Sequence, residues 1–206
     1  MSAYPLMLDG TQLHALVVGG GAVATRKVRG LLDAGARVRV VAPEVSDDLA
    51  ALATGGEVAR RLTIERRAYL PADVDGVLLV VAATDRRDVN ARVAADARAI
   101  GRLVNVADAP DEGNCATAAT HRAGDLTVAV SAGGVPGAAA RVRDLVAERL
   151  DERYADALAR LLSLRRRLHA QQDGATWRAV MEQALGDDFC PAVESGVLTQ
   201  RLAAWD

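Results

Sequence analysis

The feature that most constrains this chain is a glycine-rich segment, Gly19-Gly20-Gly21-Ala22-Val23-Ala24, which directly follows the short apolar run 15–18. The run predicts a buried strand, and the residues after the glycines carry apolar side chains at helical spacing. In this G-x-G-x-x-A pattern Gly19 allows a tight turn, Gly21 lets a pyrophosphate approach the backbone, and Ala24 lets helix and strand pack closely. The helix N-terminus offers free N–H groups and a partial positive charge to phosphates. The order strand, loop, helix favours dinucleotide binding over glycines that serve tight packing alone.

Strand-like and helix-like segments alternate through the first hundred residues. The sequence predicts strands over 15–18, 37–41, 57–64, 77–82 and 103–106, the third with weaker patterning. It predicts helices over 23–34, over 47–53 with Ser46 as N-cap, and from a cap at Thr84 or Asp85 to Ile100. Gly35 is placed to end the first helix. This alternation predicts an α/β fold with a Rossmann-like, doubly wound parallel sheet.

The character of the chain changes after Asp108. A turn-rich acidic stretch, 109–114, is followed by one more predicted strand, 126–131, then by a glycine-rich segment and a helical pattern that runs almost to the end. The helical pattern is broken near 173–174 and 186–191. A lone strand outside the first sheet needs a partner for its open edges, and the same strand of a second subunit is one solution. We therefore expect a homodimer.

Composition excludes several classes of function. The 25 Lys and Arg are balanced by 27 Asp and Glu, and aromatic residues make up 3% of the chain, so neither a basic field nor a stacking platform for nucleic acid is expected. Cys115 and Cys190 stand 75 residues apart without a Cys/His cluster, so no metal site and no disulfide framework is predicted. Apolar runs are far shorter than a membrane span, and no secretory signal opens the chain. We expect a cytoplasmic protein that does not associate with membranes.

The residues after the second and fifth predicted strands bear on the cofactor and the chemistry. Glu44 could reach the adenosine ribose, or it is a solvated loop residue. Arg37 and Arg39 could bind a 2′-phosphate, so NADP stays open as the cofactor, although NAD is favoured. Asn105 and Asp108 lie at the sheet edge where ligands of such folds bind. Asp108 there is either a base that exchanges protons with a substrate or a residue that shapes the turn before the following proline.

Several of these segments together resemble the precorrin-2 dehydrogenase family, which includes the N-terminal module of siroheme synthase. The resemblance covers about residues 4–150. It rests on the following segments in order: 4–8, 17–27, 35–38, 40–44, 82–85, Val89-Asn90, 105–108, 126–131, Gly133-Gly134 and Ala140-Arg141. The chain departs from many relatives at 115–119, where an aromatic residue and a Pro-Ala pair are replaced, and at Ala132, which is serine in some bifunctional members.

The resemblance implies an NAD-dependent oxidation of precorrin-2 to sirohydrochlorin, with Asp108 as the catalytic residue. It places cofactor contacts in four matched segments, at Gly19, Gly21, Ala22, Val23, Ala24, Pro43, Glu44, Thr84 and Asn105. It also implies an intertwined homodimer with a NAD-binding Rossmann domain (1–111), a small dimerisation region (112–147) and a C-terminal helical domain (148–206). Insertion of Fe²⁺ into the product, with the metal as co-substrate, is left open.

A substrate with several carboxylates requires local positive charge in a chain of net charge −2. Ser131 and Gly133-Gly134 before a helix N-terminus form a candidate anion site, and Arg141 and His121 could add charge. The alternative for Arg141 is that it lies on a solvated helix face. A rival of another class is a non-catalytic NAD-sensing Rossmann module, which needs the glycine loop but has no use for Asp108 or Gly133-Gly134.

Overall fold

The computed structural model of the chain describes residues 3–54 and 56–205. The chain divides into two compact units, Met1–Thr117 and Ala118–Asp206. Each unit has hydrophobic core residues of its own.

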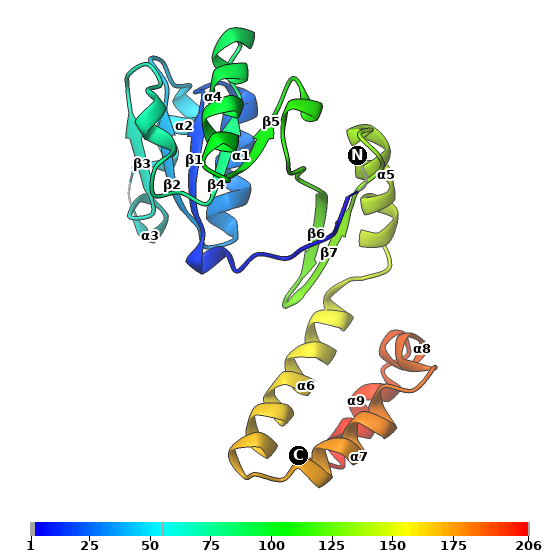
Figure 1. Ribbon diagram of the computed structural model, residues 1–206. Coiled ribbons are helices and arrows are strands. Elements are labelled where there is room, and N and C mark those ends of the chain that lie inside the picture. The colour runs from blue at the N-terminus through cyan, green and yellow to red at the C-terminus, as the bar shows by residue number, and fades with distance from the viewer. Residues whose placement is uncertain (1–2, 55, 206) are drawn as a thin grey trace. The chain divides into compact units, whose positions relative to one another are not determined.

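The first unit is built on a parallel sheet whose strands run in the order β3-β2-β1-β4-β5 (Figure 1). The strands are β1 (His14–Val18), β2 (Arg37–Val41), β3 (Leu62–Glu65), β4 (Leu79–Ala82) and β5 (Leu103–Val106). The helices are α1 (Ala22–Asp33), α2 (Asp47–Leu52), α3 (Gly56–Ala59) and α4 (Arg87–Ala99), with single turns η1 (Gly10–Gln12), η2 (Pro71–Val74) and η3 (Pro110–Glu112). Val18 pairs with both Val41 and Ala82, so the central strands end level at one edge. The predicted α/β fold with a doubly wound parallel sheet is confirmed.

Helices cover both faces of this sheet. On one face Val28 and Leu32 of α1 pack against strand side chains such as Val17 and Val40. On the other face α4 packs its buried residues against the alternate side chains of the same strands. These core residues are almost all Val, Leu and Ala, which explains how a chain with few aromatic residues fills its interior.

The predicted helix boundaries hold at two places. Ser46 caps α2 and accepts a hydrogen bond from the Leu49 N–H at 3.3 Å. Gly35 follows α1 with φ of +90°, the left-handed conformation that glycine adopts at low cost.

Two local predictions were wrong. The segment 57–64 is not one strand: its start lies in α3, and β3 begins at Leu62. The long helix α4 begins at Arg87 after Arg86, without a side-chain cap, instead of being capped by Thr84 or Asp85. The Thr84 hydroxyl is used within the preceding loop, where it contacts Asn90 Oδ1 at 2.7 Å and accepts from the Arg86 N–H at 3.1 Å.

The second unit begins with an antiparallel hairpin of β6 (Ala119–Ala123) and β7 (Leu126–Val130). The turn contains Gly124 with φ of +56°, and a Cβ there would lie 2.9 Å from the Ala155 methyl group. The expectation of a lone strand in this region was therefore wrong, because β6 of the same chain pairs with β7. The sequence concealed β6, since its inward positions carry Ala119, His121 and Ala123 and not the usual β-branched residues.

The rest of the second unit is helical, as the sequence predicted. Its helices are α5 (Pro136–Ala147), α6 (Glu152–Ala170), α7 (Gly174–Ala184), α8 (Phe189–Glu194) and α9 (Val197–Ala203). Leu161, Leu164 and Leu168 of α6 pack with Val180 of α7 and Leu198 of α9 in one buried cluster. Within residues 3–54 and 56–205, no helix combines the length and apolarity that a membrane crossing requires.

Candidate functional site

The glycine loop between β1 and α1 is fixed by contacts that leave no room for side chains at its first two positions. Gly19 has φ of +128°, and a Cβ there would lie 2.3 Å from the Ala83 carbonyl oxygen. A Cβ on Gly20 would lie 1.9 Å from the Glu44 carbonyl oxygen. The Gly19 N–H donates to the Val41 carbonyl at 3.0 Å. These contacts hold the loop against the ends of β2 and β4.

Gly21 differs from its neighbours because the space beside it is open. A Cβ at this position would meet no atom within 4 Å. Gly21 is the N-cap of α1 and supplies no side-chain cap to the first turn. Its carbonyl accepts from the Thr25 N–H at 2.9 Å and from the Thr25 hydroxyl at 3.0 Å, which orders the first turn. The loop thus presents an uncapped helix N-terminus beside open space, the arrangement that a pyrophosphate requires.

The other predicted residues of this loop have distinct surroundings. Ala24 is fully buried, which allows α1 to lie close to the sheet. Val23 is 41% exposed and belongs to the open side of the loop. Pro43 and Glu44 are exposed directly after β2, beside the loop.

The two arginines that left NADP open are not placed for a 2′-phosphate. Arg37 is the first residue of β2 and lies at the amino end of the strand. The Arg39 guanidinium is held by Asp73, with Nη2 donating to the Asp73 carbonyl at 2.5 Å and Nη1 3.3 Å from Oδ1. It also lies 3.7 Å from Glu65.

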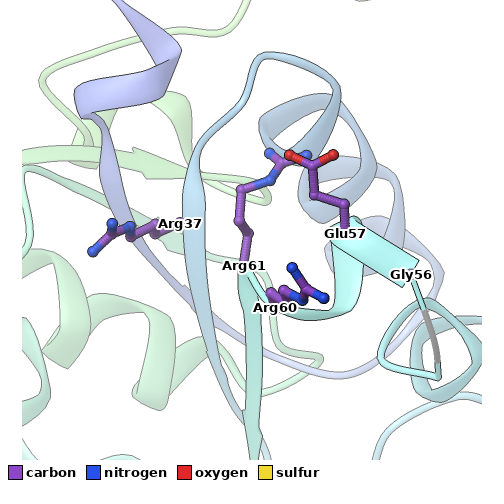
Figure 2. Close-up of a pocket in the computed structure, with 5 residues that line it drawn as sticks. All are labelled: Arg37, Gly56, Glu57, Arg60 and Arg61. Carbon is purple, nitrogen blue, oxygen red and sulfur yellow. The ribbon is translucent and has the colours of Figure 1, made fainter.

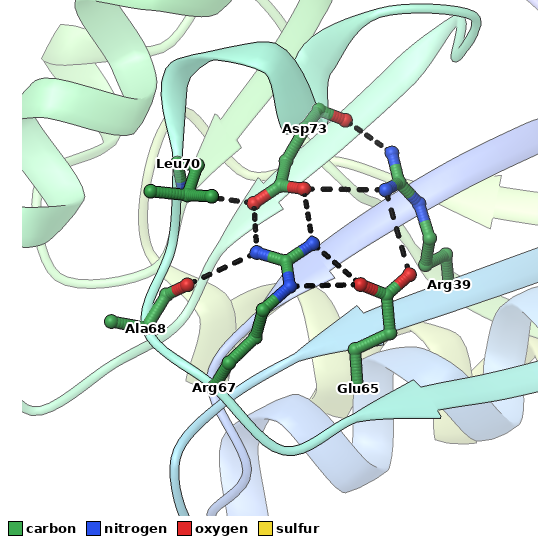
Figure 3. Close-up of polar contacts among 6 residues, drawn as sticks. All are labelled: Arg39, Glu65, Arg67, Ala68, Leu70 and Asp73. Carbon is green, nitrogen blue, oxygen red and sulfur yellow. Dashed lines mark hydrogen bonds and ion pairs between the residues drawn. The ribbon is translucent and has the colours of Figure 1, made fainter.

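Asp73 is the centre of a network of ionic groups from β2, β3 and the loop between β3 and η2 (Figure 3). The Arg67 guanidinium donates to both carboxylate oxygens of Asp73, at 2.6 and 2.8 Å. The Leu70 N–H also donates to Asp73 Oδ2, at 2.8 Å. The Arg67 hydrogen bonds hold the pKa of the Asp73 carboxyl below its usual range, against the opposing effect of burial. Two carboxylates and two guanidinium groups balance in charge, so the network stabilises the loop and offers little net charge to a ligand.

A pocket of about 650 Å³ lies at the amino ends of β2 and β3 (Figure 2). Arg37, Arg60 and Arg61 line it together with Glu57. The Arg61 guanidinium donates to the Leu32 carbonyl at 2.8 Å, so part of its charge serves the end of α1. This pocket is at the opposite end of the strands from the glycine loop and belongs to a different edge of the sheet.

Asp108 lies two residues beyond the end of β5, and its side chain is 39% exposed. Its Oδ1 accepts a hydrogen bond from Asn90 Nδ2 at 2.9 Å, and its Oδ2 lies 3.9 Å from Arg87 Nε. Arg87 also forms an ion pair with Glu112. Asp108 therefore has one oxygen held by an amide and a second oxygen accessible beside a guanidinium group.

Asn105 is a buried polar residue of β5. Its Nδ2 donates to the Cys115 carbonyl at 3.2 Å, whereas its Oδ1 is buried and has no hydrogen-bond partner among the described residues. An unpaired buried acceptor costs about 1–3 kcal/mol. Nearby, burial raises the pKa of the Cys115 thiol, and burial lowers the pKa of Lys27, whose Nζ donates to Thr117 at 2.5 Å.

The first unit brings together one group of the predicted residues at the carboxyl edge of its sheet. These are Gly19, Gly21, Ala22, Val23, Ala24, Pro43, Glu44, Thr84, Asn105 and Asp108. Sequence reasoning did not select Arg87 or Asn90, although Asn90 stood in a matched segment. The signal was an asparagine inside a helix, where its low helix propensity calls for an explanation.

The predicted substrate residues all belong to the second unit. Ser131 is exposed after β7, and Gly133 and Gly134 have φ of +57° and +92° in open surroundings. Arg141 is exposed on α5. His121 of β6 is occupied, with Nε2 2.6 Å from the Leu150 carbonyl oxygen. Within the described part of the chain, no three His, Cys, Asp or Glu side chains gather as metal ligands.

A parallel sheet with a glycine turn, an open Gly21 and an uncapped helix at its carboxyl edge defines a Rossmann-type dinucleotide-binding protein. Comparison with known families agrees. The chain belongs to the family described as "Putative NAD(P)-binding", whose sequence model matches residues 6–119.

Relatives extend this comparison. A siroheme synthase of Chromobacterium violaceum is 46% identical over 144 residues, which cover 69% of this chain and 30% of that protein. A siroheme synthase of Pseudomonas fluorescens is 36% identical over 198 residues, covering 91% of this chain and 41% of that protein. The chain thus spans less than half the length of these curated relatives. Among solved structures, "SirC, precorrin-2 dehydrogenase" matches 98% of this chain and 100% of its own, with a TM-score of 0.76 and 28% identity. The predicted resemblance is confirmed.

Proposed function

We propose that this chain oxidises precorrin-2 to sirohydrochlorin with NAD as the hydride acceptor. The observation that carries the proposal is the match along the whole length of a precorrin-2 dehydrogenase structure, combined with a carboxylate beside the dinucleotide edge. A non-catalytic NAD sensor would require neither Asp108 nor a likeness that extends through the second unit.

Different residues of the first unit bind different parts of the cofactor. The N–H groups at Ala22 and Val23 bind the pyrophosphate, with Gly21 leaving room for it. Glu44 after β2 accepts from the adenosine ribose, and the displacement of Arg37 and Arg39 from this position favours NAD over NADP. NAD, when bound, supplies the two-electron acceptor.

Asp108 removes the proton that the macrocycle loses when its hydride leaves. Oδ2, which lies 3.9 Å from Arg87 Nε, is the acceptor, since Oδ1 already receives the Asn90 hydrogen bond. Each turnover transfers one hydride to the cofactor and one proton to Asp108, which then releases that proton to solvent. Arg141 and the Gly133-Gly134 segment bind carboxylates of the substrate, so Arg141→Gln raises KM with little change in kcat.

The test is an anaerobic assay of the purified chain with precorrin-2 and NAD, following NADH and sirohydrochlorin. Asp108→Asn lowers kcat by about 10²–10⁴-fold, the usual contribution of a general base, while the Kd for NADH stays near that of the wild type. Asp111→Asn is the matched control, because this exposed carboxylate is close in sequence, whereas the side-chain hydrogen bond of Asn90 and the ion pairs of Arg87 go to Asp108 and Glu112. Absence of NADH from the wild-type reaction would refute the proposal.

A second reaction, insertion of Fe²⁺ into sirohydrochlorin, is favoured by the relation to siroheme synthases. Asp108 is the group that would accept the pyrrole protons released as the metal enters. Metal insertion that proceeds no faster with the protein than without it excludes this second reaction.

We also propose that the chain acts as a homodimer. The β6–β7 hairpin has only two strands, so each has an open edge. Helix α5 exposes Val142 at 46% and Leu145 at 63%, apolar surface that association would bury. Light scattering during size-exclusion chromatography measures the mass, and a monomer at micromolar concentration contradicts the proposal.

A further inference from the structure

The fully buried side chain of Asn90 uses all of its hydrogen-bonding capacity on two residues. Its Oδ1 accepts from the Thr84 N–H at 3.1 Å and contacts the Thr84 hydroxyl at 2.7 Å. Its Nδ2 donates to the Thr84 carbonyl at 3.0 Å and to Asp108 Oδ1 at 2.9 Å. An amide has two donor hydrogens and one acceptor oxygen with two lone pairs, so no part of this group is spare.

These contacts join two segments that end neighbouring strands. Thr84 belongs to the loop after β4, and Asp108 follows β5. Asn90 comes from α4, whose Val93, Ala94 and Ala97 are buried against the sheet, so the amide is held by a rigid element. The position of Asp108 Oδ1 is therefore set relative to the cofactor edge by a single buried amide.

We propose that Asn90 is the positioning residue for Asp108. The Asn90 Nδ2–H group occupies Oδ1, and so directs the accepted proton to Oδ2. Arg87 at 3.9 Å, itself paired with Glu112, is the charged group that faces Oδ2. This inference rests on the proposed function, because it assigns to Asn90 the orientation of the base that the reaction uses.

The discriminating variant is Asn90→Asp, which has nearly the same shape but lacks donors. One carboxylate oxygen still accepts from Thr84, while the other faces two acceptors, the Thr84 carbonyl and Asp108 Oδ1. Displacement of a reacting group by about 1 Å costs about 10²-fold, so kcat of the oxidation falls by that order while the Kd for NADH changes little. Asn114→Asp is the matched control, since the Asn114 side chain accepts from the Val104 N–H and donates to the Arg102 carbonyl, near β5 but away from Asp108 Oδ1.

A reciprocal exchange separates positioning of Asp108 from support of the Thr84 loop. In Asn90→Asp/Asp108→Asn, the new amide at 108 donates to the new carboxylate at 90, so the hydrogen bond returns with reversed direction. The double variant then has a higher Tm than Asn90→Asp alone, yet stays inactive because the carboxylate is buried. If Asn90 supports only the loop, the two Tm changes add with no recovery, and the inference is overturned.

A second variant, Asn90→Ser, tests the same inference if Asn90→Asp is unstable. If Asn90→Asp does not fold, Asn90→Ser keeps a small polar group and is expected to lower kcat with little change in NADH affinity. A kcat for either folded variant equal to that of the wild type overturns the inference. If the wild type itself fails to oxidise precorrin-2, the proposed function fails, whereas the Tm cycle still reports whether Asn90 and Asp108 are coupled.

Discussion

A pair of substitutions in the glycine loop tests whether this loop is shaped for the fold at one position and for a ligand at another. Gly19→Ala and Gly21→Ala each add one methyl group within three residues. The surroundings of the two added methyl groups differ completely. At Gly19 the methyl carbon would lie 2.3 Å from the Ala83 carbonyl oxygen, and at Gly21 it would meet nothing within 4 Å.

The expected loss of stability follows from these contacts. Gly19 has φ of +128°, where another residue incurs about 1–3 kcal/mol of backbone strain, and the overlap with Ala83 adds about 1–3 kcal/mol. Gly19→Ala therefore lowers the free energy of unfolding by about 2–6 kcal/mol, or roughly 2–4 °C in Tm for each kcal/mol. Gly21 has φ of −85° and ψ of −171°, ordinary extended backbone. Gly21→Ala changes stability by about 1 kcal/mol or less, the difference between glycine and alanine at an N-cap.

The expected effect on cofactor binding is the reverse. If the pyrophosphate lies against Gly21, the added methyl costs about 1–3 kcal/mol of overlap in the complex. That cost weakens NADH binding by about 5- to 150-fold, at tenfold for each 1.4 kcal/mol. Thermal unfolding measures the first effect, and calorimetric titration with NADH measures the second. A folded Gly21→Ala variant that binds NADH as tightly as the wild type would show that the open space is not the pyrophosphate site.

Other parts of the chain give further predictions. Because Arg67 holds the pKa of Asp73 low, this carboxylate adds stability above about pH 4 that is lost as the pH falls through its lowered pKa. Asp73→Asn thus costs about 1–3 kcal/mol at neutral pH and flattens the acid limb of the stability curve; an unchanged acid limb contradicts this reasoning. Burial raises the pKa of the Cys115 thiol, so at about pH 8 Cys115 is alkylated more slowly than the exposed Cys190. Site-resolved mass spectrometry measures the two rates, and equal rates would refute this prediction. Leu161→Ala truncates a buried side chain of the second unit and lowers the free energy of unfolding by about 2–5 kcal/mol, as measured by thermal unfolding. NADH binding to the first unit is retained, and loss of that binding would show that the units are not independent.

Predictions from the sequence succeeded where the determining interactions are local. The Gly35 end of α1 and the Ser46 cap of α2 depend on residues within one turn of the helix, and both are present. The strand β6 was missed because its formation depends on pairing with β7, which compensates for inward residues of low strand propensity. That omission also changed the reason for expecting a homodimer, from a lone strand to the open outer edges of a two-stranded hairpin.

In the candidate site, too, local features were predictable from the sequence and contacts between distant residues were not. The roles expected of Gly19 and Gly21 were derived from a six-residue spacing, because a tight turn and a helix N-terminus are local structures. The predicted strand 37–41 already places Arg37 at the amino end of β2, away from the ribose position. The engagement of Arg39 was not derivable in that way, because its partner, Asp73, is 34 residues away.

The sequence by itself determined that the chain forms a parallel α/β sheet with a dinucleotide loop, since hydrophobic period and glycine spacing act over short stretches. Only the tertiary structure decided what surrounds the carboxylate of Asp108. The Asn90 amide reaches it across 18 residues of sequence, and the Thr84 loop shares the same amide. Burial of that amide requires α4 to be packed on the sheet, so its four hydrogen bonds exist only in the folded unit.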